Sequence, residues 1–318
     1  MNFAMIEAAA ARLAGHARLT PLLNAPLLDA AFGKRIFVKA ECLQVTGSFK
    51  FRGAWSAVSA LPAATRGVLA YSSGNHGQGV ALAAAKHGLT AVVVMPSDAP
   101  EVKVANTKAY GAEVVLYDRA TEDRDAIGAA LCAERGLVLI KPFDNEQVIA
   151  GQGTVGLEIA DQARAMGIVA ADVLVCCGGG GLSAGIALAL EAQAPGLRLR
   201  TVEPVGFDDM ARSLVAGSRL RNASTSGSVC DAILTPSPGE LTFPVLQRLA
   251  GPGIAVNDDQ ALQAMALAFT HLRIVLEPGG AVALAAALVA DTEGPVICVA
   301  SGGNADPSLF RDALARFG

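Results

Sequence analysis

Aromatic residues make up only 5% of this 318-residue sequence, charged residues only 17%, and the formal net charge is −4. Nucleic-acid-binding surfaces are usually basic with interleaved aromatic side chains, so this composition argues against a nucleic-acid partner. Long apolar runs are also missing: the purest one, residues 281–290, is far shorter than the ~20 residues of a membrane-spanning helix. The beginning of the sequence lacks the early basic cluster of a signal peptide. We therefore expect a cytoplasmic protein without a membrane partner.

Cysteine and histidine are sparse. The six cysteines contain no C-x-x-C pair and the four histidines are scattered, so neither a disulfide framework nor a cluster of these residues around a structural metal is predicted. Apolar residues, in contrast, reach 52%, which is ample for large buried cores and excludes a disordered chain. Because the chain is longer than the modal domain of ~100–150 residues, we expect two lobes.

Short runs rich in β-branched residues alternate with longer segments rich in Ala and Leu. The predicted strands are 35–39, 67–71, 91–95, 113–117, 137–141, 172–176, 198–201 and 296–300. The predicted helices are 51–61, 77–87, 101–110, 124–135, 153–166, 182–194, 258–272 and 280–291, and residues 215–253 are expected to form a long excursion over one lobe. This alternation favours an α/β fold with mainly parallel sheets flanked by helices on both faces. Ligands of such folds bind at the carboxyl ends of the strands.

Four consecutive glycines, Gly178, Gly179, Gly180 and Gly181, follow an apolar strand and precede a helix. Without Cβ atoms, their backbone N–H groups can converge on one point, and the helix N-terminus adds positive potential. A tight turn rarely needs four glycines in a row. The pattern therefore predicts a site for a phosphate group.

Other motifs limit which class of phosphate-containing ligand the predicted site can bind. No G-x-x-x-x-G-K-[ST] motif is present, which excludes a P-loop triphosphate site. Residues 151–156 match the dinucleotide pattern G-x-G-x-x-G, but the preceding residues read as a loop. Close packing at a helix start explains these glycines better, and an NAD-binding oxidoreductase remains a remote alternative.

Lys50 lies in the first turn of a predicted helix, between Phe49 and Phe51, with Thr46 or Ser48 available as the N-cap. Apolar neighbours and the helix dipole both lower the pKa of an amine. A neutral amine can form a Schiff base, although most lysines are solvated surface charges. Together with the phosphate site, Lys50 points to pyridoxal phosphate.

Six motifs carry a resemblance to a known family. They are residues 48–54 (SFKFRGA), 72–78 (SSGNHGQ), 150–154 (AGQGT), 178–181 (GGGG), 277–281 (EPGGA) and 301–304 (SGGN). In this order they resemble the fold-type II pyridoxal-phosphate enzymes, specifically the serine/threonine dehydratase and serine racemase family. The resemblance implies a two-domain, tryptophan synthase β-like α/β fold. It also implies a large cofactor-binding domain (residues 1–58 and 145–318), a small mobile domain (residues 59–144) and a homodimer.

The resemblance also implies roles at the cofactor. Lys50 would form the imine with it and, once freed by substrate, act as the base at Cα. Phe49 would pack beside the cofactor ring, Asn75 would hydrogen-bond its phenolic oxygen, and the four glycines would hold its phosphate. Ser301 would face the pyridine nitrogen, where a neutral hydroxyl limits the electron sink and favours prompt loss of a β-leaving group.

For the substrate, an amino acid, the resemblance implies that Ser72, Ser73, Asn75 and His76 grip the carboxylate. Ser73 has a second implied role, because racemases similar to this chain place a Ser hydroxyl on the cofactor face opposite Lys50, and racemisation needs two bases. Arg124 occupies a position that can meet a second carboxylate in racemase-like relatives, which makes 3-hydroxyaspartate a candidate substrate.

A divalent metal is also implied. In racemase-like relatives a Glu, a carbonyl four residues later and an Asp six residues later bind Mg²⁺ or Ca²⁺, and Mn²⁺ is a further candidate. These positions are Glu203, Phe207 and Asp209 here. Two carboxylates, a carbonyl and waters would supply the oxygen ligands that such ions prefer, whereas the alternative is a solvated acidic loop.

We therefore expect a lyase that eliminates water from a β-hydroxy amino acid of the serine, threonine or 3-hydroxyaspartate type. Hydrolysis of the resulting enamine then gives a 2-oxo acid and ammonia. Racemisation of serine or aspartate is the main alternative. A non-catalytic amino-acid sensor on the same scaffold is disfavoured by the presence of Lys50.

Overall fold

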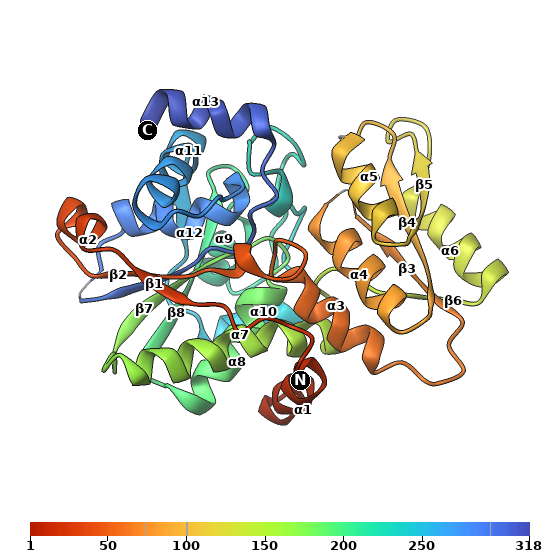
Figure 1. Cartoon of the computed structure of the whole chain (residues 1–318), viewed down its shortest axis with the longest axis horizontal. Coiled ribbons are helices and arrows are strands. Elements are labelled where there is room, and N and C mark those ends of the chain that lie inside the picture. Colours follow the sequence, from red (N-terminus) through yellow and green to blue (C-terminus); the bar gives the residue numbers. More distant parts are fainter. Residues whose placement is uncertain (73, 100, 293) are drawn as a thin grey trace.

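The computed structural model describes residues 1–72, 74–99, 101–292 and 294–318. Its described strands form two sheets, of six and four strands, which lie side by side (Figure 1). The larger sheet has the order β1-β2-β10-β7-β8-β9 and the smaller one the order β5-β4-β3-β6. The strands are β1 (Leu22–Asn24), β2 (Ile36–Lys39), β3 (Gly67–Tyr71), β4 (Thr90–Pro96), β5 (Glu113–Tyr117), β6 (Leu137–Leu139), β7 (Ala171–Cys176), β8 (Leu197–Pro204), β9 (Ile254–Val256) and β10 (Val296–Val299).

The sheets are parallel apart from the antiparallel pairing of β1 with β2. This confirms the predicted α/β class and all eight predicted strands. The sequence analysis missed β1 and β9. Each has only three residues, too few for the alternating pattern that identifies a strand.

Helices flank both sheets. In the larger sheet, α11 and α12 lie on one side and α7 and α8 on the other (Figure 1). The helices are α1 (Phe3–Leu13), α2 (Pro26–Phe32), α3 (Lys50–Ser59), α4 (Asn75–Lys86), α5 (Glu101–Ala109), α6 (Arg124–Arg135), α7 (Glu146–Ala165), α8 (Gly181–Gln193), α9 (Asp209–Ala216), α10 (Thr242–Leu249), α11 (Asp258–Leu267), α12 (Pro278–Val289) and α13 (Pro307–Phe317). Single turns are η1 (Glu41–Leu43), η2 (Asp231–Ile233) and the π-helical η3 (Ala268–Leu272).

Residues 215–253, predicted as a long excursion over one lobe, include the end of α9 and two further helical elements, η2 and α10. The sequence analysis missed α10 because it is short and follows a stretch rich in Ser, Pro and Gly. Phe243 and Leu246 on α10 are buried in the main core, which anchors the segment.

Helix α7 begins at Glu146, not at residue 153 as predicted. The Asn145 side chain caps it by accepting hydrogen bonds from the N–H groups of Gln147 and Val148. Residues 151–156 therefore lie inside a helix and form no phosphate-binding turn. Their glycines allow close packing: a Cβ on Gly151 would lie 2.5 Å from the Arg52 carbonyl oxygen.

The prediction that Thr46 or Ser48 caps α3 is wrong. The N-cap residue is Phe49, no side chain caps the helix, and the Thr46 and Ser48 hydroxyls are buried without a partner among the described residues. Pairing with the segment after β10 holds this helix start instead. The Phe49 N–H donates to the Ser301 carbonyl at 3.0 Å, and Ser48 forms an isolated bridge with Gly302.

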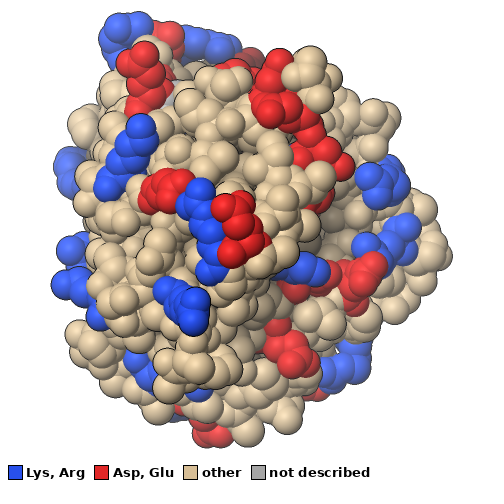
Figure 2. Space-filling model, turned by 90° about the vertical axis from the view of Figure 1, so that its right-hand side faces the viewer, with Lys and Arg blue, Asp and Glu red and all other residues tan. Residues whose placement is uncertain are grey.

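All four strands of the smaller sheet come from residues 67–139. The domain boundaries at residues 59 and 144, and the mobility of the smaller part, stay predictions. In the described part of the chain, no helix has the length and apolar character needed to span a membrane. On the face that Figure 2 shows, acidic and basic side chains are interspersed, without a continuous basic area.

Candidate active site

A cavity of about 240 Å³ lies beyond the carboxyl ends of β3, β7 and β10. It brings together residues that are far apart in the sequence and that the sequence analysis assigned to one site. The predicted site residues that line it are Phe49, Lys50, Ser72, Asn75, His76, Gly178, Gly179, Gly180, Gly181 and Ser301. Ser73 lies outside the described residues, and the candidate metal ligands do not line the cavity.

Lys50 is the first residue of α3, and its ammonium group reaches the cavity. Nζ donates to the Pro142 carbonyl at 3.1 Å and lies 5.2 Å from the centre of the Phe49 ring. Burial lowers the pKa of Lys50 to about 8, although Cys176 and Glu277 oppose this shift in part. The predicted lowering of the amine pKa is confirmed, so a substantial fraction is neutral near pH 8.

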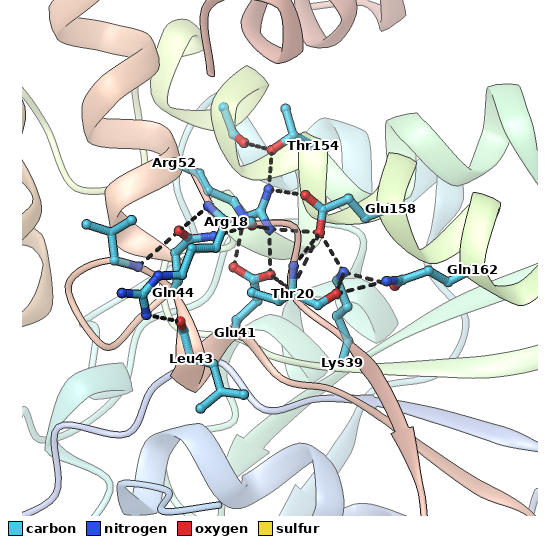
Figure 3. Close-up of polar contacts among 12 residues, drawn as sticks. Arg18, Thr20, Lys39, Glu41, Leu43, Gln44, Arg52, Thr154, Glu158 and Gln162 are labelled. Carbon is cyan, nitrogen blue, oxygen red and sulfur yellow. Dashed lines mark hydrogen bonds and ion pairs between the residues drawn. The ribbon is translucent and has the colours of Figure 1, made fainter. Parts of the chain in front are cut away.

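A buried ionic cluster holds the helix that carries Lys50. Arg52, in the first turn of α3, makes two hydrogen bonds of 2.8 Å to Glu41 and two, of 2.7 and 2.9 Å, to Glu158. Figure 3 shows Arg52 between these two carboxylates, with Lys39 beside Glu158. Burial alone would raise the pKa of Glu41, but the charge and hydrogen bonds of Arg52 outweigh it and lower that pKa. The cluster therefore fixes the start of α3 to β2, η1 and α7.

The glycine loop leaves its backbone donors available. Among the described residues, the N–H groups of Gly178, Gly179, Gly180 and Gly181 have no hydrogen-bond partner. Gly180 has φ +89°, a conformation that favours glycine, and a Cβ on Gly179 would lie 2.3 Å from the Phe143 ring. The loop packs too tightly for side chains and presents free N–H groups at the start of α8, which fits a phosphate group.

Ser301 follows β10 and is buried at the cavity wall. Its hydroxyl lies near the thiol of Cys176, the last residue of β7. Burial raises the pKa of Cys176 to about 11, so the thiol stays neutral. A neutral hydroxyl beside a neutral thiol would suit the pyridine nitrogen of pyridoxal phosphate in its unprotonated form. The sequence analysis gave Cys176 no role at the site. Its position at the end of a predicted strand, shortly before the four glycines, could have indicated that it lies there.

Asn75 opens α4, and both ends of its amide are engaged. Its Nδ2 donates to Glu277 Oε1 at 2.5 Å, and its Oδ1 accepts from Asn304 Nδ2 at 2.7 Å. Glu277 also lines the cavity, and burial raises its pKa to about 7. The sequence analysis gave Glu277 no role, although it begins the fifth motif.

His76 is buried, and its Nε2 lies 2.8 Å from the Ile140 carbonyl oxygen. Since that oxygen can only accept, Nε2 carries the proton, and Nδ1 has no partner among the described residues. Burial and the nearby charge of Lys50 lower the pKa of His76 to about 3. His76 is therefore neutral near pH 7 and can position a ligand but cannot serve as an acid there.

Charged side chains from α5, α6 and η2 lie at the mouth of the cavity. Lys103 on α5 pairs with Asp231 on η2 at 2.9 Å. Arg124 lies over the Tyr71 ring, 4.9 Å from its centre, and also lines the cavity. The cationic groups could meet a second carboxylate of a substrate.

The candidate metal ligands gather after β8. Both Glu203 oxygens accept backbone N–H groups of α9, at 2.9 and 2.8 Å. One Asp209 oxygen accepts from Asn222 at 2.6 Å, and the other is buried without a partner in the described part of the chain. Burial and the charge of Asp209 raise the pKa of Glu203. Within the described residues, no group of three or more His, Cys, Asp or Glu is arranged to hold a metal, but the predicted set has only two carboxylates.

Known proteins resemble the whole chain. The family model described as "Pyridoxal-phosphate dependent enzyme" matches residues 13–302. An L-threo-3-hydroxyaspartate ammonia-lyase of Pseudomonas sp is 41% identical, over 96% of this chain and 96% of that protein. A serine racemase of Oryza sativa subsp. indica is 37% identical, over 98% and 93%. The crystal structure of a threonine deaminase from T.th. superposes with a TM-score of 0.92 at 46% identity, covering 96% of this chain and 99% of that chain.

Proposed function

Because the chain belongs to the pyridoxal-phosphate dependent enzyme family of fold type II, we propose that it eliminates water from a β-hydroxy amino acid, after which a water molecule hydrolyses the released enamine and sets ammonia free. The product would be a 2-oxo acid. One observation carries the proposal: a single cavity joins the Lys50 amine, the free N–H groups of the glycine loop and the neutral Ser301 hydroxyl. When bound, pyridoxal phosphate supplies the electron sink that makes the substrate Cα–H acidic.

The chain's own residues then have distinct tasks. The four glycines would bind the phosphate, Phe49 would pack on the ring, and Asn75 would donate to the phenolic oxygen. Ser301 would contact the pyridine nitrogen. Its hydroxyl cannot hold a proton there as a carboxylate would, which favours elimination over a long-lived carbanion.

Lys50 would take the proton from the substrate Cα. Its lowered pKa, about 8, keeps part of the amine neutral and able to accept a proton. Ser72, Asn75 and His76 would orient the substrate carboxylate, with Ser73 as the fourth member of this group. Since His76 stays neutral and its free Nδ1 can only accept, it would orient the carboxylate through its backbone N–H and not through its ring.

We propose serine, threonine and threo-3-hydroxyaspartate as the candidate substrates. Relatives that this chain resembles are named as ammonia-lyases of L-threonine and of L-threo-3-hydroxyaspartate. Arg124 and Lys103 at the cavity mouth support the dicarboxylic substrate. Racemisation is the second candidate, supported by the serine racemases among the relatives and by a Ser at position 73.

One substrate panel separates these activities. The holoenzyme is given L-serine, L-threonine, L-threo-3-hydroxyaspartate and L-phenylserine, and both 2-oxo acid and inverted amino acid are measured. We expect 2-oxo acid as the main product. Ser73→Ala should lower any racemisation by about 10²-fold, the usual contribution of one acid–base group, and spare elimination. Absence of 2-oxo acid from every substrate would contradict the proposal, and racemisation alone would favour the second candidate.

We propose that Glu203, Asp209 and the Phe207 carbonyl bind Mg²⁺, with Ca²⁺ or Mn²⁺ as substitutes. The unpartnered, buried Asp209 oxygen beside the Glu203 carboxylate supports a cation there. Bound Mg²⁺ should raise the melting temperature, because a ligand of the folded state stabilises it. Asp209→Asn should abolish this shift, and Asp208→Asn, the matched control, should keep it. An Asp209→Asn variant that still responds to Mg²⁺ would contradict the site.

We also propose that the protein is a cytoplasmic homodimer. All six cysteines are free thiols, which suits a reducing compartment. The resemblance to dimeric family members motivates the assembly, which size-exclusion chromatography with light scattering would measure.

A further inference from the structure

Glu277 is a buried carboxyl at the wall of the cavity. Its backbone caps α12, with the carbonyl accepting from the N–H groups of Gly280 and Ala281. Its side chain is packed so closely that a Cβ on Gly302 would lie 2.0 Å from Oε1. Oε1 therefore lies close against the backbone of Gly302, and from there it reaches Asn75.

A directional chain of hydrogen bonds leads to Glu277. Asn304 Nδ2 donates to the Thr46 carbonyl at 2.9 Å, and because a carbonyl only accepts, this fixes the orientation of the Asn304 amide. The same nitrogen donates to Asn75 Oδ1, so Asn75 must turn its Nδ2 towards Glu277. Asn75 Nδ2 has two hydrogens, and Glu277 takes one of them. The second N–H remains for a ligand in the cavity that Asn75 lines.

The hydrogen bond to Asn75 uses Oε1 of Glu277, and no hydrogen bond to the second oxygen, Oε2, is found among the described residues. The carboxyl can therefore gain or lose a proton without breaking its contact with Asn75. Burial raises the pKa of Glu277 to about 7, while the Asn75 hydrogen bond lowers it in part. A carboxylate accepts a stronger hydrogen bond from Asn75 than a neutral carboxyl does.

We propose that Glu277 is a positioning residue, which acts through Asn75 to hold one amide N–H towards the phenolic oxygen of the cofactor. The proposal rests on the proposed function, since it requires pyridoxal phosphate in this cavity. Ionisation of Glu277 strengthens the hydrogen bond that it accepts from Asn75. The Asn75 amide is therefore held more firmly towards the phenolic oxygen as the pH rises through about 7.

Other groups act on the same carboxyl and belong to its electrostatic environment. Lys50 and Lys103 lower its pKa, and Asp231 raises it. The titratable groups that interact with Glu277, from each element, are Lys50 of α3, Lys103 of α5, Asp231 of η2, Cys42 of η1 and Cys176 of β7. Burial raises the pKa of Cys42 to about 12 and that of Cys176 to about 11, so both thiols stay neutral near pH 7. The pKa of the free Lys50 amine is lowered to about 8.

Two substitutions separate the hydrogen bond from the charge. Glu277→Gln keeps an oxygen that accepts from Asn75 but cannot ionise, and Glu277→Leu keeps most of the volume but accepts nothing. The dissociation constant of pyridoxal phosphate is measured for each variant, together with the pH dependence of the absorbance of the bound cofactor. Each variant is also combined with Asn75→Ala.

We expect Glu277→Gln to bind the cofactor within about 3-fold of the wild type, with the absorbance change near pH 7 lost. Glu277→Leu should weaken cofactor binding by about 10-fold, the value of one hydrogen bond. In the Asn75→Ala background, the same Leu substitution should change binding by less than about 2-fold, because the residue through which Glu277 acts is gone.

Two results would overturn the inference. One is that Glu277→Leu weakens cofactor binding equally in the wild-type and the Asn75→Ala backgrounds. The other is that the absorbance of the cofactor bound to Glu277→Gln changes with pH as it does in the wild type. The second needs only the near-isosteric Gln variant, so it remains decisive if Glu277→Leu does not fold. Failure of the wild type itself to take up pyridoxal phosphate would instead overturn the proposed function, and this inference with it.

Discussion

Replacing Lys50 with alanine should lower kcat by about 10⁴-fold and remove the covalently held, coloured cofactor at the same time. The amine is both the point of attachment and the base at Cα, and one acid–base group alone contributes about 10²–10⁴-fold. Lys50 makes only one hydrogen bond to the described residues, to the Pro142 carbonyl. The fold should therefore survive the substitution. Absorbance spectra and 2-oxo acid production measure the two effects.

A matched control is Lys86→Ala, which removes an exposed lysine at the end of α4. This variant should keep both colour and turnover. The assignment of Lys50 would be contradicted if Lys50→Ala kept the same absorbance and rate as the wild type.

Arg52→Met should lower the free energy of unfolding by about 3–5 kcal/mol at pH 7. Removing one partner of a buried ion pair leaves the other charges without compensation, and here both Glu41 and Glu158 lose Arg52. Met retains most of the length and apolar contact of the side chain, so the loss reflects charge and hydrogen bonding. Denaturant unfolding of the apoprotein measures it. A loss below about 1 kcal/mol would contradict the role of the cluster in holding α3.

The cost of Arg52→Met should depend on pH in one direction. The pKa of Glu41 lies below its ordinary value of 4.5 in the folded wild type. Its contribution to stability is therefore present above that value and is lost as the pH falls through the lowered pKa. The difference between Arg52→Met and the wild type should shrink as the solution is acidified. Arg164→Met, which removes an exposed pair with Asp161, is the control and should cost less than about 1 kcal/mol at either pH.

Local chemistry made much of this molecule predictable. The predicted convergence of free N–H groups at Gly178 to Gly181 depends only on consecutive backbone groups, and phosphate binding there stays a prediction. The lowered pKa of Lys50 followed from its apolar neighbours, although burial in the folded chain is what causes it. The parallel strands were visible because they are buried on both faces and are rich in β-branched residues.

The misses concern contacts between segments far apart in the sequence. Helix α3 needs no side-chain cap because the segment after β10 pairs with its first residues, which no local pattern reveals. The glycines of α7 match a nucleotide-binding motif, but in the structure they allow α3 and α8 to pack closely against α7. Glu277 meets Asn75 across 202 residues of sequence. A lone Glu before Pro gives no indication of burial, of a raised pKa or of a partner.

The most direct test is to reduce the holoenzyme with borohydride, digest it and weigh the peptides. We predict that the pyridoxyl phosphate mass is found on the peptide that contains Lys50, and that fragmentation assigns it to that side chain. If position 50 carries no label while another lysine does, the cavity described above does not hold the cofactor and the proposed chemistry is wrong.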